Sequence, residues 1–251
     1  MDSRELNLLI AQAAEESVEK VPQTTAPNPC TCEPASIAKY IDHTYLNPQA
    51  SLDDIHRICA EAKEYHTASV CVNPCYIAFV AQELRGSDVT PCCVISFPFG
   101  ASTPEAKSFE ARDAAEKGAK EIDMVANIGA IKSGEWELVR RDIQGVVDAV
   151  GGIACVKVII ETCLLTDKEK VKVCAVAKLA GAHFVKTSTG FSSGGARVED
   201  VALMRQTVGD ALGVKASGGI HSYEEVCAML SAGANRIGAS ATAKIISGPE
   251  A

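Results

Sequence analysis

A regular alternation of short apolar runs with longer amphipathic segments constrains this chain more than any other feature. From Ile37 onward, eight strand-sized apolar runs are separated by segments with helical signals. The runs are YIDHT (40–44), ASVCVN (68–73), PCCVISFP (91–98), EIDMVA (121–126), ACVKVIIET (154–162), AHFVKTS (182–188), GVKASG (213–218) and NRIGAS (235–240). Strands that alternate with helices predict parallel strands joined by right-handed crossovers.

Capping signals mark the ends of the intervening helices. Four of these helices open with a capping residue followed by an acid or a proline: Ser51, Thr103, Thr166 and Ser222. Three close at a glycine just before the next apolar run: Gly118, Gly181 and Gly233. Eight such units in about 210 residues predict a closed (β/α)₈, or TIM, barrel over residues 37–251. The alternative is a doubly wound open sheet, but no GxGxxG follows the first strand.

Residues 1–36 carry a different pattern and are expected to form an N-terminal extension. Over residues 4–20, a helical spacing of apolar positions predicts an amphipathic helix, which a proline-rich linker separates from the barrel. The linker contains a lone C-x-C, Cys30 and Cys32, with no second Cys/His pair at metal spacing. We therefore expect no metal there.

Composition narrows the class of protein. The net charge of −8 and the pI of about 5.2 disfavour nucleic acid and anionic membranes as partners. The eleven cysteines are odd in number and several lie in apolar runs, so they are interpreted as buried small residues in a reducing, cytoplasmic compartment. No apolar run approaches the ~18 residues of a transmembrane helix. The first residues also lack the basic segment of a secretory signal.

Charged residues stand inside or directly after several apolar runs, where an unpaired charge is costly. Asp123 ends EID in the fourth run, Lys186 ends FVK in the sixth, and Lys215 ends VK in the seventh. Active sites of such barrels lie at the C-terminal ends of the strands. Lys157 and Glu161 in the fifth run are four residues apart and are expected to share a face and support one another. For this pair, a purely structural ion network is the alternative.

Two lysines on adjacent strands predict a nucleophile. Ammonium groups about 5 Å apart repel by roughly 3 kcal/mol at an effective dielectric of about 20, which favours the neutral amine on one of them. A neutral lysine attacks carbonyl groups. With Asp123 as the proton acceptor, Lys186 and Lys215 are thus predicted to form a Schiff-base site.

Glycine-rich loops follow the seventh and eighth runs. SGGI (217–220) and GAS (238–240) each precede a predicted helix. Glycine lets backbone N–H groups approach an anion, and this is the usual place for a phosphate in a barrel.

These stretches resemble the deoxyribose-phosphate aldolase family. The matching motifs are YIDHTYL (40–46), EIDMVANIGAIK (121–132), VKVIIET (156–162), FVKTSTGF (184–191), VKASGGI (214–220) and RIGAS (236–240), in the family's order. The resemblance implies a metal-independent class I aldolase without a cofactor. It would cleave 2-deoxy-D-ribose 5-phosphate to glyceraldehyde 3-phosphate and acetaldehyde.

The resemblance also assigns roles to residues. Lys186 would be the Schiff-base nucleophile, Lys215 the lysine that tunes it and Asp123 the proton-transfer residue. Pocket and phosphate contacts would come from Thr187, Thr189, Gly190, Gly218, Gly219, Gly238 and Ser240. Lys157, Asp42 and Thr44 would support the site.

Three features depart from some members of the family. Phe191 stands where some have a lysine that helps to hold phosphate, and Ala241 stands where some have a serine. The chain ends ISGPEA, without the terminal tyrosine that assists proton transfer in some. The alternatives are a barrel aldolase for a ketose phosphate and a phosphosugar-binding barrel without catalysis. A homo-oligomer is left open.

Overall fold

The structure, a computed structural model, describes residues 5, 8–10, 12 and 34–248. Of the predicted N-terminal helix, residues 5, 8–10 and 12 are helical. The rest of that helix, the linker up to residue 33 and the C-x-C of Cys30 and Cys32 lie outside the described residues. No helix in the described part of the chain is both long and apolar enough to cross a membrane.

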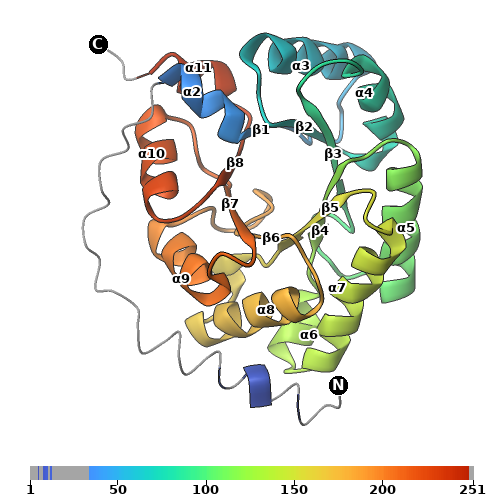
Figure 1. The fold of residues 1–251 in the computed structure, drawn as a ribbon, viewed down its shortest axis with the longest axis vertical. Coiled ribbons are helices and arrows are strands. Elements are labelled where there is room, and N and C mark those ends of the chain that lie inside the picture. The colour runs from blue at the N-terminus through green and yellow to red at the C-terminus, as the bar shows by residue number, and fades with distance from the viewer. Residues whose placement is uncertain (1–4, 6–7, 11, 13–33, 249–251) are drawn as a thin grey trace.

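Eight parallel strands close into a barrel, as the sequence predicts (Figure 1). Each strand pairs with the next along the chain, and β8 pairs with β1 to complete the ring. The strands are β1 (Ile41–Tyr45), β2 (Ser69–Val72), β3 (Thr90–Ile95), β4 (Glu121–Val125), β5 (Cys155–Ile159), β6 (Phe184–Lys186), β7 (Gly213–Ser217) and β8 (Arg236–Ala239).

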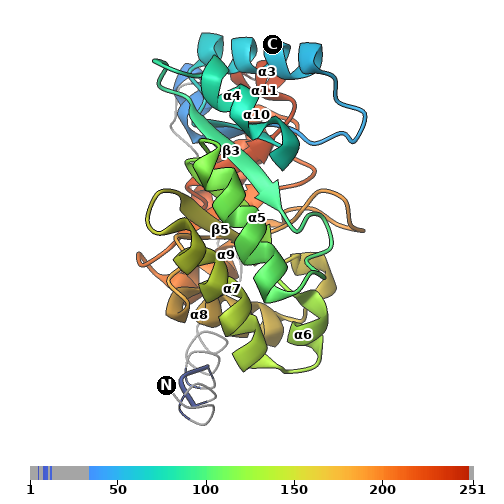
Figure 2. The same cartoon turned by 90° about the vertical axis from the view of Figure 1, so that its right-hand side faces the viewer.

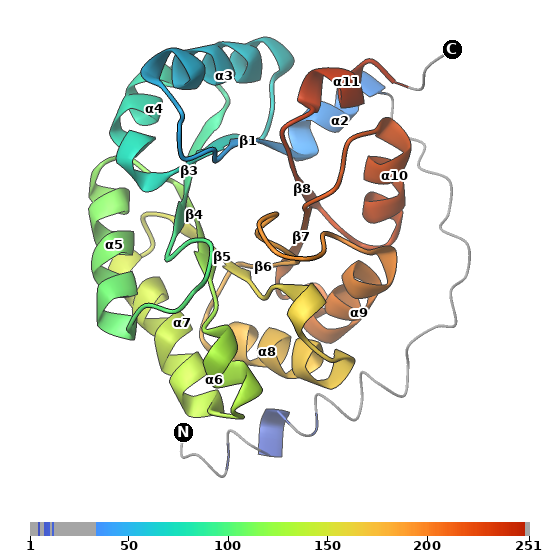
Figure 3. The ribbon, with the colours of Figure 1, turned by 180° about the vertical axis from the view of Figure 1, so that it is seen from behind.

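Helices form a ring outside the strands (Figures 1 and 3). They are α2 (Pro34–Ile37), α3 (Leu52–Tyr65), α4 (Ile77–Glu83), α5 (Pro104–Glu116), α6 (Ile128–Lys132), α7 (Trp136–Val150), α8 (Asp167–Leu179), α9 (Val198–Val208), α10 (Tyr223–Ser231) and α11 (Thr242–Ile246). Figure 2 shows α5 and α7 side by side on the outer surface. Short 3₁₀ turns lie at Ala38–Tyr40, Pro74–Tyr76 and Thr162–Leu164.

The predicted capping residues begin their helices. Ser51, Thr166 and Ser222 each accept a hydrogen bond from the backbone of the third helical residue, whose carboxylate bonds back in a capping box. Thr103 caps α5, with a proline at the first position. Gly118, Gly181 and Gly233 have φ of 108°, 80° and 109°, a region that glycine enters without a steric penalty. These local choices set the length of each helix and so the place where the next strand begins.

The apolar core lies between the strands and the helices, and the barrel interior is different. Outward positions such as Val70, Ile122 and Val158 belong to one large buried cluster with the helices. The apolar cluster found inside the barrel is small, with Cys71, Cys92 and Val94 at its centre. Barrel interiors are usually filled by branched apolar side chains. Here a group of charged side chains also lies inside the ring.

Two expectations about strand ends are wrong. Asp123 and Lys215 each lie third in a five-residue strand, because their apolar runs continue past them. The fifth run was expected to extend to residue 162, but β5 ends at Ile159 and Glu161 has left-handed backbone with φ of 52°. The alternation of side chains is broken there, and Glu161 pairs with Thr189 instead of Lys157.

Candidate active site

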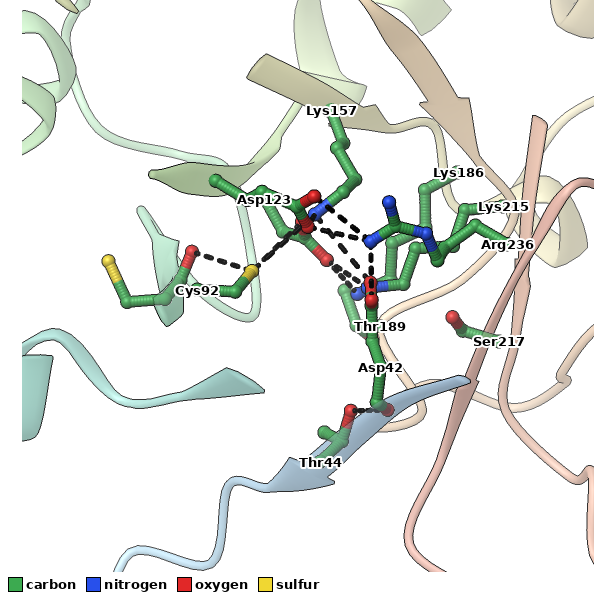
Figure 4. A network of polar contacts seen from close by, with 12 residues as sticks. Asp42, Thr44, Cys92, Asp123, Lys157, Lys186, Thr189, Lys215, Ser217 and Arg236 are labelled. Atoms are coloured by element: carbon green, nitrogen blue, oxygen red, sulfur yellow. Dashed lines mark hydrogen bonds and ion pairs between the residues drawn. The ribbon is translucent and has the colours of Figure 1, made fainter. Parts of the chain in front are cut away.

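Seven charged side chains converge inside the barrel from six strands (Figure 4). We call them the central charge cluster: Asp42 of β1, Glu121 and Asp123 of β4, Lys157 of β5, Lys186 of β6, Lys215 of β7 and Arg236 of β8. Strand register brings them together, because Lys186 lies opposite Lys215, and Lys215 lies opposite Arg236.

Asp123 is the hub of the cluster. Its Oδ1 accepts a hydrogen bond from Lys157 Nζ at 2.8 Å, and its Oδ2 accepts from Lys186 Nζ at 2.8 Å and from Lys215 Nζ at 2.7 Å. Burial alone would raise the pKa of Asp123, but Lys157, Lys186 and Lys215 together hold it well below its usual range. The carboxylate is therefore ionised, and it accepts hydrogen bonds from three lysine side chains.

Lys215 and Lys157 are each held by several carboxylates. Lys215 Nζ donates to both Asp42 and Asp123, and Lys157 Nζ lies 2.6 Å from Glu121 and 2.8 Å from Asp123. Burial lowers the pKa of Lys215, but attraction to Asp123 and Asp42 outweighs it, so the pKa is raised. The pKa of Lys157 is raised well above its usual value in the same way. Repulsion between neighbouring lysines, expected from the sequence, is thus offset by carboxylates at these two positions.

Lys186 differs from the other lysines of the cluster. Among the described residues, Lys186 Nζ contacts one carboxylate, that of Asp123. Lys186 and Lys215 both bind the same oxygen of that carboxylate, Oδ2. The cluster has three carboxylates and four cationic groups, so its charges balance when one amine is neutral. Among the three cluster lysines, Lys186 lines the pocket described next.

A pocket of about 660 Å³ opens at the C-terminal end of the barrel, above the charge cluster. Of the residues assigned to the site from the sequence, eight line it: Thr44, Lys186, Thr189, Gly190, Gly218, Gly219, Gly238 and Ser240. Asp42, Asp123, Lys157 and Lys215 lie beneath its floor and are fully buried. The loop between β6 and α9 curls over the centre of the barrel in Figure 3.

Thr187 does not line this pocket. Its hydroxyl donates to the Ser217 carbonyl at 3.1 Å and accepts from the Ser217 N–H at 3.0 Å, which joins the end of β6 to the end of β7. The side chain is thus engaged by backbone in this structure, and its expected contact with the substrate stays a prediction.

The loops that carry the predicted phosphate site lie on one side of the pocket. Gly218 and Gly219 follow β7 with φ of 87° and 76°. Directly before α10, Glu225 accepts hydrogen bonds from the backbone N–H groups of His221 and Ser222. The predicted phosphate loops thus lead into a helix whose first turn is closed by a capping box.

An aromatic side chain also forms part of the pocket wall. Phe191 lines the pocket and packs edge-on against Phe97, with ring centroids 5.3 Å apart. The position that is lysine in some relatives is thus apolar and half-exposed here. Ala241, the other departure, is not part of the pocket wall.

Comparison with known proteins now identifies the family. The family model of DeoC/LacD aldolases matches residues 36–248. The chain belongs to the DeoC/LacD family of aldolases. A deoxyribose-phosphate aldolase from Enterococcus faecalis is 60% identical over 210 residues, which cover 84% of this chain and 96% of the relative.

Solved structures of the aldolase family share the fold. A protein from Coccidioides immitis, assigned as a deoxyribose-phosphate aldolase, is 40% identical with a TM-score of 0.92 over 98% of this chain and 97% of that one. The tetrameric deoxyribose-phosphate aldolase of Aeropyrum pernix is 31% identical with a TM-score of 0.79, over 98% of this chain and 97% of that one.

Sequence reasoning missed two members of the cluster. Glu121 lies two residues before Asp123 and so on the same face of β4, a signal that was available from alternation. Arg236 donates to Asp42 at 2.6 Å and to Glu121 at 2.8 Å. Its position inside the barrel follows from pairing with β7, which sequence alone does not give.

Sequence reasoning also missed a polar chain beside the pocket. His43 Nε2 lies 2.9 Å from Glu61 of α3, and His43 Nδ1 lies 2.7 Å from the Thr242 hydroxyl of α11. Burial lowers the pKa of His43 despite the nearby Glu61. The imidazole joins β1 to the helix that follows the Ser240 loop.

One set of side chains in the described residues has the spacing of metal ligands: Cys71, Cys92 and Asp123. The Asp123 carboxylate already contacts three lysines, and the positive charges of Lys157 and Lys215 oppose a further cation. This donor set does not suit a metal ion.

Proposed function

We propose that this chain is a class I aldolase that reversibly cleaves 2-deoxy-D-ribose 5-phosphate to D-glyceraldehyde 3-phosphate and acetaldehyde through a Schiff base on Lys186. The relative from E. faecalis is named a deoxyribose-phosphate aldolase, which supports this reaction. The observation that carries the assignment of Lys186 is its place as the pocket-lining lysine of the cluster, with one carboxylate contact.

The charge cluster explains how a lysine is made available at neutral pH. If all four cations of the cluster were charged, one positive charge would be unbalanced in a buried site, which is costly. Lys215, Lys157 and Arg236 are each bound by two or more carboxylates and keep their protons. Lys186 contacts one carboxylate and lines the pocket, so its amine is the one placed to attack the substrate.

Cleavage begins when the Lys186 amine adds to the C1 aldehyde and water leaves, forming an iminium. The new positive charge lies beside Asp123, which stabilises it. A water molecule activated by the ionised Asp123 carboxylate and oriented by Lys215, whose Nζ lies 2.7 Å from Asp123, accepts the proton of the C3 hydroxyl. The C2–C3 bond then breaks, and its electron pair moves to the iminium nitrogen.

The products follow from that step. C3 becomes the aldehyde carbon of glyceraldehyde 3-phosphate, and C1–C2 remains on Lys186 as an enamine. Protonation at C2 and addition of water release acetaldehyde and restore the lysine. The iminium withdraws electrons throughout, so the mechanism contains no metal or cofactor.

The substrate phosphate would lie at the loops of Gly218, Gly219, Gly238 and Ser240, which line the pocket. With Phe191 in place of a lysine, backbone N–H groups supply most of that contact. We further propose a cytoplasmic homo-oligomer, supported by the tetrameric A. pernix relative.

The test is an assay of acetaldehyde release by the full-length protein. Wild type is expected to cleave 2-deoxy-D-ribose 5-phosphate, and Lys186→Arg to lose at least about 10³-fold in kcat. The matched control is Lys132→Arg, at a half-exposed lysine paired with Glu169. Cleavage of a ketose phosphate instead would indicate a different barrel aldolase. Binding of the sugar phosphate without cleavage would indicate a non-catalytic barrel.

A further inference from the structure

The hydroxyl of Ser217 lies in the pocket and has no hydrogen-bond partner in the part of the chain that the structure describes. Ser217 ends β7, its side chain is 5% exposed, and it lines the pocket beside Lys186. Among the described residues, its Oγ has no hydrogen-bond partner. In Figure 4 the hydroxyl points toward the centre of the cluster and no dashed line reaches it. A buried hydroxyl without a partner is destabilising and calls for a reason.

The surroundings hold this hydroxyl in place. Both backbone groups of Ser217 are bound by the Thr187 hydroxyl, so the residue has little freedom to turn away. Across the strand pair, a β-carbon on Gly238 would lie 2.2 Å from Ser217 Oγ and 3.1 Å from Lys215 Cε. The absence of a side chain at Gly238 therefore makes the space that the hydroxyl occupies, beside the Lys215 chain.

This position lies between the two ends of the substrate. Lys215 is two residues earlier on the same face of β7, and Gly218 and Gly219 of the phosphate loop follow directly. A sugar joined to Lys186 at C1, with its phosphate at the glycines, passes Ser217 on the way. The C3 hydroxyl faces Lys215 and Asp123, so the next hydroxyl toward the phosphate is that on C4.

We propose that Ser217 hydrogen-bonds the C4 hydroxyl of the substrate and thereby selects acceptor aldehydes that carry a hydroxyl next to the carbonyl. In the synthetic direction, that hydroxyl is the C2 hydroxyl of glyceraldehyde 3-phosphate. The inference rests on the proposed function and adds a specificity-determining residue to it. It also predicts that Ser217→Ala is at least as stable as wild type, because an unpartnered hydroxyl is removed.

The experiment compares two acceptors with acetaldehyde as donor: D-glyceraldehyde 3-phosphate and 3-phosphooxypropanal, which lacks the C2 hydroxyl. Ser217→Ala is expected to lower kcat/KM about tenfold for the first, the effect of losing one hydrogen bond, and to leave the second within about twofold. Ser217→Cys keeps a side chain of similar size whose S–H is a weak donor. Its kcat/KM for D-glyceraldehyde 3-phosphate should lie between the values of wild type and Ser217→Ala.

The matched control is Ser188→Ala. Ser188 is also a buried serine two residues after a lysine, and its Oγ also has no partner among the described residues, but it does not line the pocket. Ser188→Ala should leave kcat/KM unchanged for both acceptors. An equal loss with both acceptors, no loss with either, or the same selectivity in Ser188→Ala would overturn the proposal. If wild type joins acetaldehyde to neither acceptor, the proposed function itself fails, and this inference fails with it.

Discussion

At the residue scale, the site is a set of mostly buried opposite charges that compensate one another. Asp123 and Lys186 were predictable because charged residues stand out in apolar runs. Their partners were harder to predict, since Lys215 bonds Asp42 from 173 residues away and Arg236 bonds it from 194. Such contacts depend on barrel closure and strand register. From the sequence, the repulsion between Lys186 and Lys215 was estimated without the carboxylates of Asp42 and Glu121. The estimate was therefore too large.

Substitution of Lys215 tests the charge balance. Lys215→Leu leaves three carboxylates and three cations in the cluster, so the excess positive charge that favours release of a proton from the cluster is gone. Activity should fall at least about 100-fold, and its rise with pH should move to higher pH. The measurement is kcat/KM between pH 6 and 10 for a variant shown to be folded. Since the pKa of Lys215 is raised, the wild-type residue stays protonated over this range.

A buried lysine elsewhere provides the control for this experiment. Lys170 of α8 is also held by two carboxylates, with Nζ 2.9 Å from Asp167 and 2.6 Å from Asp200. Lys170→Leu should cost stability and leave the pH profile where it is. An unmoved profile in Lys215→Leu would contradict the charge-balance account and make Lys215 a structural partner only.

At the element scale, side-chain hydrogen bonds fix the ends of strands and the loops that follow them. The Thr187 hydroxyl ties β6 to β7, and the Thr242 hydroxyl ties α11 to His43 on β1. Capping boxes and glycines made the helices predictable, because these signals are local. The contacts between loops were not predictable, because they link segments far apart in the chain.

The tie between Thr242 and His43 predicts an effect on phosphate binding. Thr242→Val keeps the shape but removes the hydroxyl that positions the loop carrying Ser240. KM for 2-deoxy-D-ribose 5-phosphate should rise about threefold to tenfold, with kcat within about twofold, since Thr242 does not contact the charge cluster. Thr242→Ser should restore the wild-type KM. An equal loss with unphosphorylated 2-deoxyribose would mean that Thr242 supports the whole barrel rather than the phosphate loop.

At the scale of the whole molecule, the barrel follows from one repeated pattern. Eight strand–helix units with consistent caps leave few topologies open, and the ring closes because each strand pairs with the next and β8 pairs with β1. The order of the strands, the place of the pocket and the two adjacent lysines were therefore predictable. The polar interior was not fully predictable, because inward and outward positions of residues such as Arg236 are assigned only once the ring is closed.

The central claim is that Lys186 is the one lysine of the cluster that reacts with an aldehyde. The direct measurement is reduction with borohydride in the presence of acetaldehyde, followed by proteolysis and mass spectrometry. We predict one two-carbon adduct on the peptide that contains Lys186, and none in Lys186→Arg. An adduct on Lys215 or Lys157, or no adduct on an active enzyme, would contradict the account.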